Sequence, residues 1–187
     1  MGGMLRPSIA LLMMCIGCGG DDGATQLPGG SVDLKESIGA NVMKEDDGVL
    51  MIVTASTTGL CADARATPPI DRQGQHFIVI ELADVGGANT TAPTAPGTYT
   101  IYPNTGTRPA KSASFVTGAF DDTCQTDDAF DGQGQSGSVV LTAIGTRFQG
   151  TYDVVLNTGD HVTGAFDAAP CTDLQAAVTN SQHACMP

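Results

Sequence analysis

The chain has 187 residues and carries 8 Lys plus Arg against 20 Asp plus Glu, a formal net charge of −12 at pH 7. Such an acidic surface repels phosphate backbones and anionic lipids, which argues against nucleic acid as a partner and against electrostatic membrane binding. Its 6 cysteines are more typical of an exported, disulfide-bonded protein than of a cytosolic one.

The N-terminus has the features of an export signal. Arg6 precedes a short apolar run, Ile9 to Gly17. This run cannot cross a bilayer core of about 30 Å as a helix, so it predicts a signal peptide over residues 1–17. The run ends at Gly17 and is followed by Cys18. This segment resembles the lipobox of bacterial lipoproteins. The resemblance implies that Cys18 becomes a lipidated N-terminus, that acyl chains attach the protein to a membrane, and, through Gly19, that it reaches the outer membrane.

A tether is expected after the lipidated cysteine. The stretch "GGDDGATQLPGGS" is rich in Gly, Asp, Pro and Thr, which predicts a flexible segment without a core over residues 18–40. Residues 41–187 then suffice for a single β domain.

The domain reads as a series of short strands separated by turn residues, with almost no helical periodicity. This pattern predicts an all-β fold, an antiparallel sandwich or barrel of about seven to nine strands, with a short helical segment near the C-terminus. Strands are expected near residues 48–56, 76–83, 97–102, 113–120, 137–144, 147–156 and 161–167.

The sequence "VTGAFD" occurs twice, at Val116–Asp121 and Val162–Asp167. We interpret the repeat as sheet geometry rather than as a duplicated binding site, because its polar positions are Thr and Asp and not a convergent catalytic set. The second copy pairs with "RFQGTYDVVL", and the three-residue loop Asn157–Gly159 sets the register of the hairpin. Duplication and convergence on a favoured hairpin both remain open as its origin.

That register predicts large rings over bare glycines. Tyr152 would lie opposite Gly164, and Phe166 opposite Gly150, so that each ring covers exposed backbone. The first copy follows "GTYTIYPNTG" and, by analogy, predicts Tyr99 over Gly118 and Phe120 over Gly97.

Several segments together resemble small uncharacterised lipoproteins of myxobacteria. They are the lipobox, the short Gly/Asp tether, "SGSVVLTAI", "GTYDVVL" and "VTGAFDAAPC". The resemblance implies a β-rich exported domain and no known activity.

Four cysteines remain after Cys15 leaves with the signal and Cys18 receives lipid, and they allow three disulfide pairings. We expect Cys61 with Cys124 and Cys171 with Cys185, since a helical turn after Cys171 would return the chain over a short distance. The rival pairing of Cys124 with Cys171 would tie the two "VTGAFD" copies together. Zinc is not expected, because no CxxC or Cys/His spacing is present.

Few residues suggest catalysis. "GQSGS" at Gly134–Ser138 lacks the last glycine of a nucleophile elbow and is expected in a loop before a strand. His76, His161 and His183 have no partner at local spacing, which favours solvated surface positions.

One acidic run is the densest candidate site. Its aspartates could hold calcium through carboxylate oxygens, although Ala129 and Phe130 interrupt the ligand pattern, and the alternative is a solvated loop pinned by a disulfide. The aspartates are Asp121, Asp122, Asp127, Asp128 and Asp131.

These features favour a non-catalytic exported surface lipoprotein, anchored in the bacterial cell envelope, that binds a partner or supports the envelope. An envelope protein or a glycan is the expected partner, and calcium is the one cofactor considered. The alternatives are an exported enzyme with an acidic site, using two close carboxylates, and a calcium-binding module.

Overall fold

The computed structural model describes residues 24–44, 47–87 and 89–187. The predicted signal peptide, residues 1–17, and Cys18 therefore lie outside the described residues. The elements in chain order are β1 (Ala24–Leu27), β2 (Gly30–Asp33), β3 (Glu36–Lys44), β4 (Asp47–Ala55), α1 (Leu60–Arg65), β5 (Ile70–Arg72), β6 (His76–Gly86), β7 (Asn89–Thr91), β8 (Gly97–Ile101), β9 (Lys111–Ala119), β10 (Gly132–Ala143), β11 (Phe148–Leu156), β12 (His161–Pro170), α2 (Leu174–Thr179) and β13 (Ala184–Met186). Among these residues, no helix has the length and apolar character needed to span a membrane.

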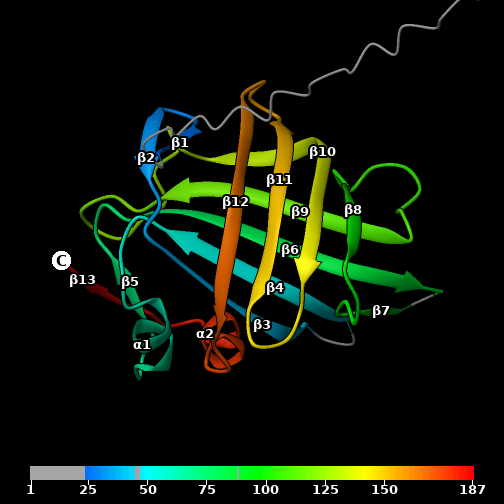
Figure 1. Cartoon of the computed structure of the whole chain (residues 1–187). Coiled ribbons are helices and arrows are strands. Elements are labelled where there is room, and N and C mark those ends of the chain that lie inside the picture. Colours follow the sequence, from blue (N-terminus) through cyan, green and yellow to red (C-terminus); the bar gives the residue numbers. More distant parts are fainter. Residues whose placement is uncertain (1–23, 45–46, 88) are drawn as a thin grey trace, which may run out of the picture.

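Eight strands close into a barrel in the order β4-β3-β12-β11-β10-β8-β9-β6, because β6 pairs again with β4 (Figure 1). The all-β prediction is confirmed in its barrel form, and all seven predicted strands are present. The barrel is mixed rather than wholly antiparallel, since β12 pairs with β3 and β8 pairs with β9 in parallel. The hairpin patterns of the sequence predicted the antiparallel pair β11–β12, but they also predicted an antiparallel hairpin of β8 with β9 and did not indicate the pairing of β12 with β3.

The described part of the predicted tether is folded. Residues 24–40 are not a free segment: they form the β1–β2 hairpin and most of the first barrel strand, β3. Leu27, Val32 and Ile38 are buried there. These apolar side chains, spaced among glycines and a proline, supply enough buried area to order a segment whose composition alone is typical of a linker.

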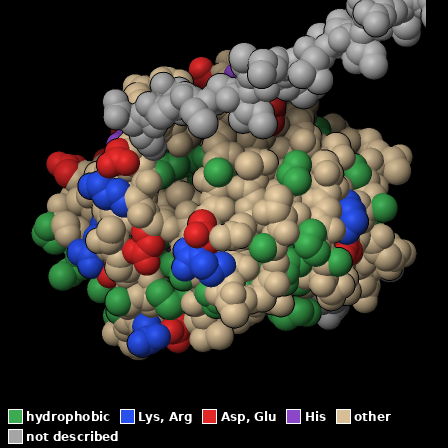
Figure 2. Space-filling model, in the orientation of Figure 1, with side chains coloured by type: hydrophobic (Ala, Val, Ile, Leu, Met, Phe, Trp, Pro, Cys, Tyr) green, Lys and Arg blue, Asp and Glu red, His purple; other side chains and the backbone are tan. Residues whose placement is uncertain are grey.

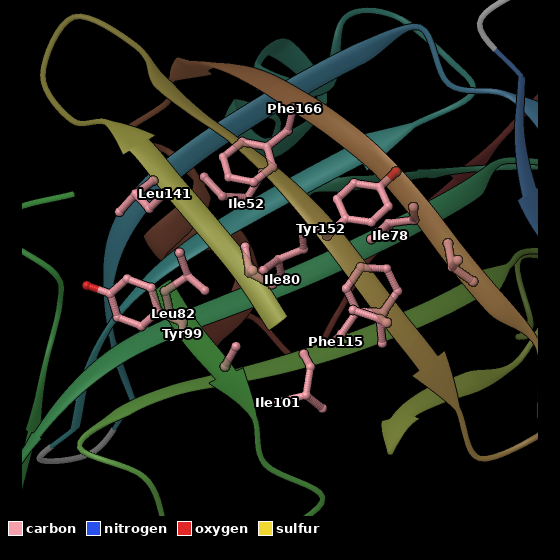
Figure 3. Close-up of a cluster of buried hydrophobic side chains, with 14 of the residues drawn as sticks. Ile52, Ile78, Ile80, Leu82, Tyr99, Ile101, Phe115, Leu141, Tyr152 and Phe166 are labelled. Atoms are coloured by element: carbon pink, nitrogen blue, oxygen red, sulfur yellow. The ribbon is translucent and has the colours of Figure 1, made fainter. Parts of the chain in front are cut away.

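Side chains fill the inside of the barrel. Tyr99, Phe115 and Tyr152 lie among branched aliphatic residues from several strands (Figure 3). Each fully buried Leu or Ile stabilises the fold by roughly 1.5–3 kcal/mol. This interior is therefore a packed core, and a binding site has to be sought outside it.

The second "VTGAFD" hairpin has the predicted register. Tyr152 pairs with Gly164, and Gly150 pairs with Phe166. A Cβ atom added at Gly164 would overlap the Tyr152 hydroxyl, and one added at Gly150 would overlap the Phe166 ring. The turn ends in Gly159 at φ +91°, a left-handed conformation that favours glycine. Both predicted ring-over-glycine contacts are confirmed.

The first "VTGAFD" copy also pairs its glycine with an aromatic ring, but on the outer face of the barrel instead of the inner one. The predicted contacts of Tyr99 and Phe120 are therefore wrong. Gly118 pairs with Phe77 of β6, and a Cβ at Gly118 would lie 2.6 Å from that ring. The Lys111 side chain covers Gly97. The reason is topological: β8 and β9 are parallel neighbours, so they cannot form the hairpin that the second copy makes.

Strand β4 is buried on both faces, so a second layer of the protein covers its outer face. Leu50 and Ile52 point into the barrel core, whereas Val49 and Met51 belong to a second apolar cluster on the outside. Leu60 of α1 and Leu174 of α2 pack onto that outer cluster. We refer to α1, β5, α2 and β13 as the outer layer, which in Figure 1 lies beside the lower end of the barrel.

The ring-over-glycine contact can be tested with a double-mutant cycle. Gly164→Ala should lower the melting temperature, because the new methyl group displaces the Tyr152 ring, and overpacking of this kind costs about 1–3 kcal/mol. In a Tyr152→Leu background the same substitution should cost much less. Equal losses in both backgrounds, measured by thermal unfolding, would contradict this contact.

Candidate functional site

An apolar cleft of about 220 Å³ lies between the barrel wall and the outer layer. Val53, Phe77 and Val79 form its barrel side. Ala64 and Ala177, from the two helices, lie across from them. A concave apolar surface with a few polar groups at its edge is the usual form of a small-molecule site, so this cleft is the candidate functional site.

Two disulfides fasten the outer layer to the barrel. Cys61 of α1 is bonded to Cys171 at the end of β12, and Cys124 is bonded to Cys185 of β13. All four predicted cysteines form disulfides, but the predicted pairing and its rival are both wrong, and the third pairing is present. Sequence separations of 110 and 61 residues make each bond worth about 4–5 kcal/mol in the chain-entropy model.

Two features that decide the disulfide pairing are not indicated by the sequence. The short helix α1 was not predicted, and it places Cys61 against the end of β12 rather than near the acidic loop. Strand β13 pairs in parallel with β5, which carries Cys185 away from α2. Cys185 therefore meets Cys124, whose sulfur lies 3.5 Å from the Asp71 carbonyl oxygen of β5.

The acidic side chains at the cleft are held by partners of their own. Asp63, which is 6% exposed, receives two hydrogen bonds of 2.7 Å from the Arg72 guanidinium. Gln75 is buried beside them and donates to the Thr57 hydroxyl. A bidentate ion pair of this kind fixes α1 against β5 and neutralises the one buried carboxylate that the cleft contains.

His183 also lines the cleft and has acceptors at both ring nitrogens. Nδ1 lies 2.9 Å from Asp71 Oδ1, and Nε2 lies 3.2 Å from the Ala177 carbonyl oxygen. Because both neighbours only accept, the ring with two N–H groups fits best. Burial lowers the pKa of His183, but Asp71 and the carbonyls of Ala177 and Asn180 outweigh it and raise the pKa above its ordinary value.

The acidic run is a structural loop in this fold. The carboxylate of Asp121 accepts hydrogen bonds from the Thr123 hydroxyl and from the backbone N–H groups of Thr123 and Gln125, and these keep the pKa of Asp121 below its usual range. Phe130 anchors the loop, with its ring 4.4 Å from His76 and its edge against Gly29. The interruption of the ligand pattern at Phe130 thus has a packing function.

Within residues 121–131, no three carboxylates come close enough to share an ion. In the described part of the chain, the one cluster with suitably close ligand atoms consists of Cys61, Cys171 and Asp173. Its two sulfurs are joined to each other, so they are not free thiolates. The residues predicted for calcium, Asp121, Asp122, Asp127, Asp128 and Asp131, are therefore not brought together as a site.

The remaining candidates are dispersed. His161 is exposed, as predicted, and lies 2.7 Å from Asp153. His76 differs from the surface position predicted for it, because its Nδ1 is buried and has no hydrogen-bond partner among the described residues. "GQSGS" lies inside β10 rather than in a loop, and Gly137 there adopts φ +115°.

Basic side chains on the described surface are mostly paired. Arg65 with Asp173 links α1 to α2, and Lys111 with Asp84 and Arg147 with Asp167 lie on the barrel. On the face shown in Figure 2, basic side chains lie next to acidic ones, and these pairs are separated from one another. The cleft thus adjoins paired charges rather than a strong field of one sign.

Comparisons of this chain with protein-family models, curated proteins and solved structures gave no match. The sequence favoured a solvated surface position for His183, which lines the cleft, and it carried no signal for Asp63 or Asp71. The available signal was the apolar run of β4, "VLMIV", because a strand buried on both faces requires a second layer.

The contact between His183 and Asp71 predicts a pH dependence of stability. With a pKa raised above about 6.5, the contact contributes fully below that pH and is lost as the pH rises through the raised value. His183→Gln should therefore lower the melting temperature by about 2–4 °C at pH 5.5 and by little at pH 9. In an Asp71→Asn background the effect should vary less with pH, because the main partner that raises the pKa of His183 is removed, and a loss that does not change with pH in either background would refute this assignment.

Proposed function

We propose that this protein is a non-catalytic, lipid-anchored binding module of the bacterial cell envelope, and that it holds a small apolar ligand in the cleft under the outer layer. The observation that carries the proposal is the cleft itself: an open apolar surface lies beside a barrel whose interior is already packed. Its volume is below the roughly 300–1,000 Å³ of sites that enclose a whole drug-sized molecule. A ring system or a segment of an acyl chain matches it in size and polarity.

Two disulfides support export, because such bonds persist in oxidising compartments. The resemblance of the N-terminus to a lipobox supports an acyl anchor at Cys18, with the outer membrane as the destination. An acidic protein of this kind has little attraction to anionic lipid, so acyl chains would supply its attachment.

The alternative of an exported enzyme has less support. A catalytic carboxylate pair needs two acids in different environments that are free to exchange protons. At the cleft, Arg72 binds Asp63 through both carboxylate oxygens, and Asp71 contacts His183. A calcium-binding role has less support still, since the carboxylates of Asp121 and Asp127 in the acidic loop accept hydrogen bonds from the backbone of their own turns.

Occupancy of the cleft can be tested with the neutral fluorophore N-phenyl-1-naphthylamine. We expect its emission to increase and shift to the blue on titration with the protein. Ala64→Phe places a ring in the cleft and should weaken binding at least tenfold.

The matched control is Ala62→Phe, an exposed position on the same helix that does not line the cleft. Binding should be unchanged in this variant. Absence of any emission change with the unmodified protein, or equal losses in both variants, would overturn the binding proposal.

The anchor can be tested by expression in a bacterium that processes lipoproteins. Mass spectrometry should find an acylated N-terminus at Cys18, and Cys18→Ala should move the protein from the membrane fraction to the soluble fraction. Cys15→Ala is the control and should stay with the membrane. An unmodified terminus at Asp21 or beyond would show that the resemblance to a lipobox is misleading.

A further inference from the structure

A second surface, on the barrel wall away from the cleft, lies where three strands separate. Strand β10 pairs with β9 at Gly132–Gln133 and with β8 at Ser138–Leu141. Strand β9 pairs with β8 at Ser112–Ala113. Between these ladders, residues 134–137 of β10 do not pair with Ser114 and Phe115 of β9.

The opening results from a bend in β10. The pairing of β10 with β11 shifts between Gly134 and Ser136, and Gly137 adopts φ +115° with Asp153 so close that no side chain fits. Figure 1 shows β10 turning here from the direction of β9 to that of β11. Behind the bend, Ile101 and Phe115 lie close to Gly134 and close the floor. The result is a groove of about 300 Å³ rather than a hole into the core.

The groove is lined by uncharged hydrogen-bonding groups. Amides and hydroxyls from four segments surround it: Tyr102, Asn104, Ser114, Gln133, Gln135 and Asn157. None of its lining residues carries a charge, in a chain with 20 acidic residues. The side-chain oxygen of Asn157 accepts the Gln133 backbone N–H at 2.9 Å, so the donor that Asn157 still offers is its amide nitrogen.

An aromatic ring stands at the edge of the groove. Tyr102 is held by a hydrogen bond of 3.2 Å from its hydroxyl to the Gly106 carbonyl oxygen. The Arg108 guanidinium lies 6.0 Å from the ring centroid and lines the neighbouring recess, not the groove. Tyr102 lines both the groove and this recess, so its ring lies between the uncharged groove and the charged recess.

These groups match the chemistry of a neutral sugar. Each amide both donates and accepts, as does each sugar hydroxyl, so adjacent hydroxyls can be met by a single Asn or Gln side chain. The C–H face of a pyranose ring can stack on the negative face of Tyr102. An anionic glycan would meet repulsion from the net charge of −12. A peptide strand has little room, because ladders fill both ends of the short opening.

We propose that the groove between β8, β9 and β10 is a binding site for a neutral glycan, independent of the apolar cleft. Gln135 of β10 and Asn104 of the loop after β8 supply hydrogen bonds, and Tyr102 supplies the stacking face. The site would let the protein hold a polysaccharide while its lipid anchor holds the membrane.

Affinity electrophoresis of the full chain in native gels tests this proposal. Gels containing dextran, mannan, soluble starch or xylan serve as neutral probes, and alginate serves as the polyanionic probe. We expect at least one neutral polysaccharide to slow migration and alginate to have no effect. The variant with Gln135→Ala and Asn104→Gly should bind on the order of tenfold more weakly, for two lost hydrogen bonds. Glycine is chosen at Asn104 because φ there is +60°.

Three controls keep the outcome interpretable. Gln182→Ala removes an exposed amide outside the groove and should leave migration unchanged. Ala64→Phe fills the apolar cleft and should also leave it unchanged, which separates this site from the proposed function. Gln135→Ala alone covers the case in which the double variant does not fold. Failure of all four neutral gels to slow the protein, or equal slowing of the groove variants, would overturn the proposal.

Discussion

Strand β4 buries side chains on both of its faces, and the architecture depends on covering both of these apolar faces. Its inner side chains complete the barrel core, while its outer ones would lie in water if the barrel stood alone. Exposed apolar surface of this kind requires cover, because roughly 25 cal/mol is gained for each Å² removed from water. The outer layer supplies that cover, and its elements are consequently found only over the wall formed by β3, β4 and β6.

The outer layer is too small to be stable alone. Its helices have six residues each and its strands three, far below the length at which isolated helices persist in water. It is therefore tied down by two disulfides, the Asp63–Arg72 ion pair and the His183–Asp71 contact. Fixed supports at its edges, together with small residues such as Ala64 and Ala177 on its inner side, leave the cleft between the layers unfilled.

The two copies of "VTGAFD" show how one local device serves two environments. In β12 the Val, Gly and Phe positions face the barrel core, and Tyr152 covers Gly164. In β9 the same positions face outward, where Phe77 covers Gly118 and packs against Phe120 at 5.1 Å between ring centroids. A glycine opposite a ring works on either face, because it depends on the direct pairing of two residues and not on which side is the core. The repeat thus contributes to the core once and to the cleft once.

The sequence by itself determined most of the strands, the hairpin of β11 and β12 with its register, and the involvement of four cysteines in disulfides. These features depend on alternation, turn residues and composition, which act between neighbours in the chain. The tertiary structure alone decided the barrel closure, the order in residues 24–40, the disulfide pairing and the cleft. Each of these needs contacts between segments far apart in sequence, such as β12 with β3 or β13 with β5, for which no local pattern exists. Asp63 and Arg72 show the same limit, since an acid and a base nine residues apart become a buried pair only after α1 and β5 have packed against the barrel wall.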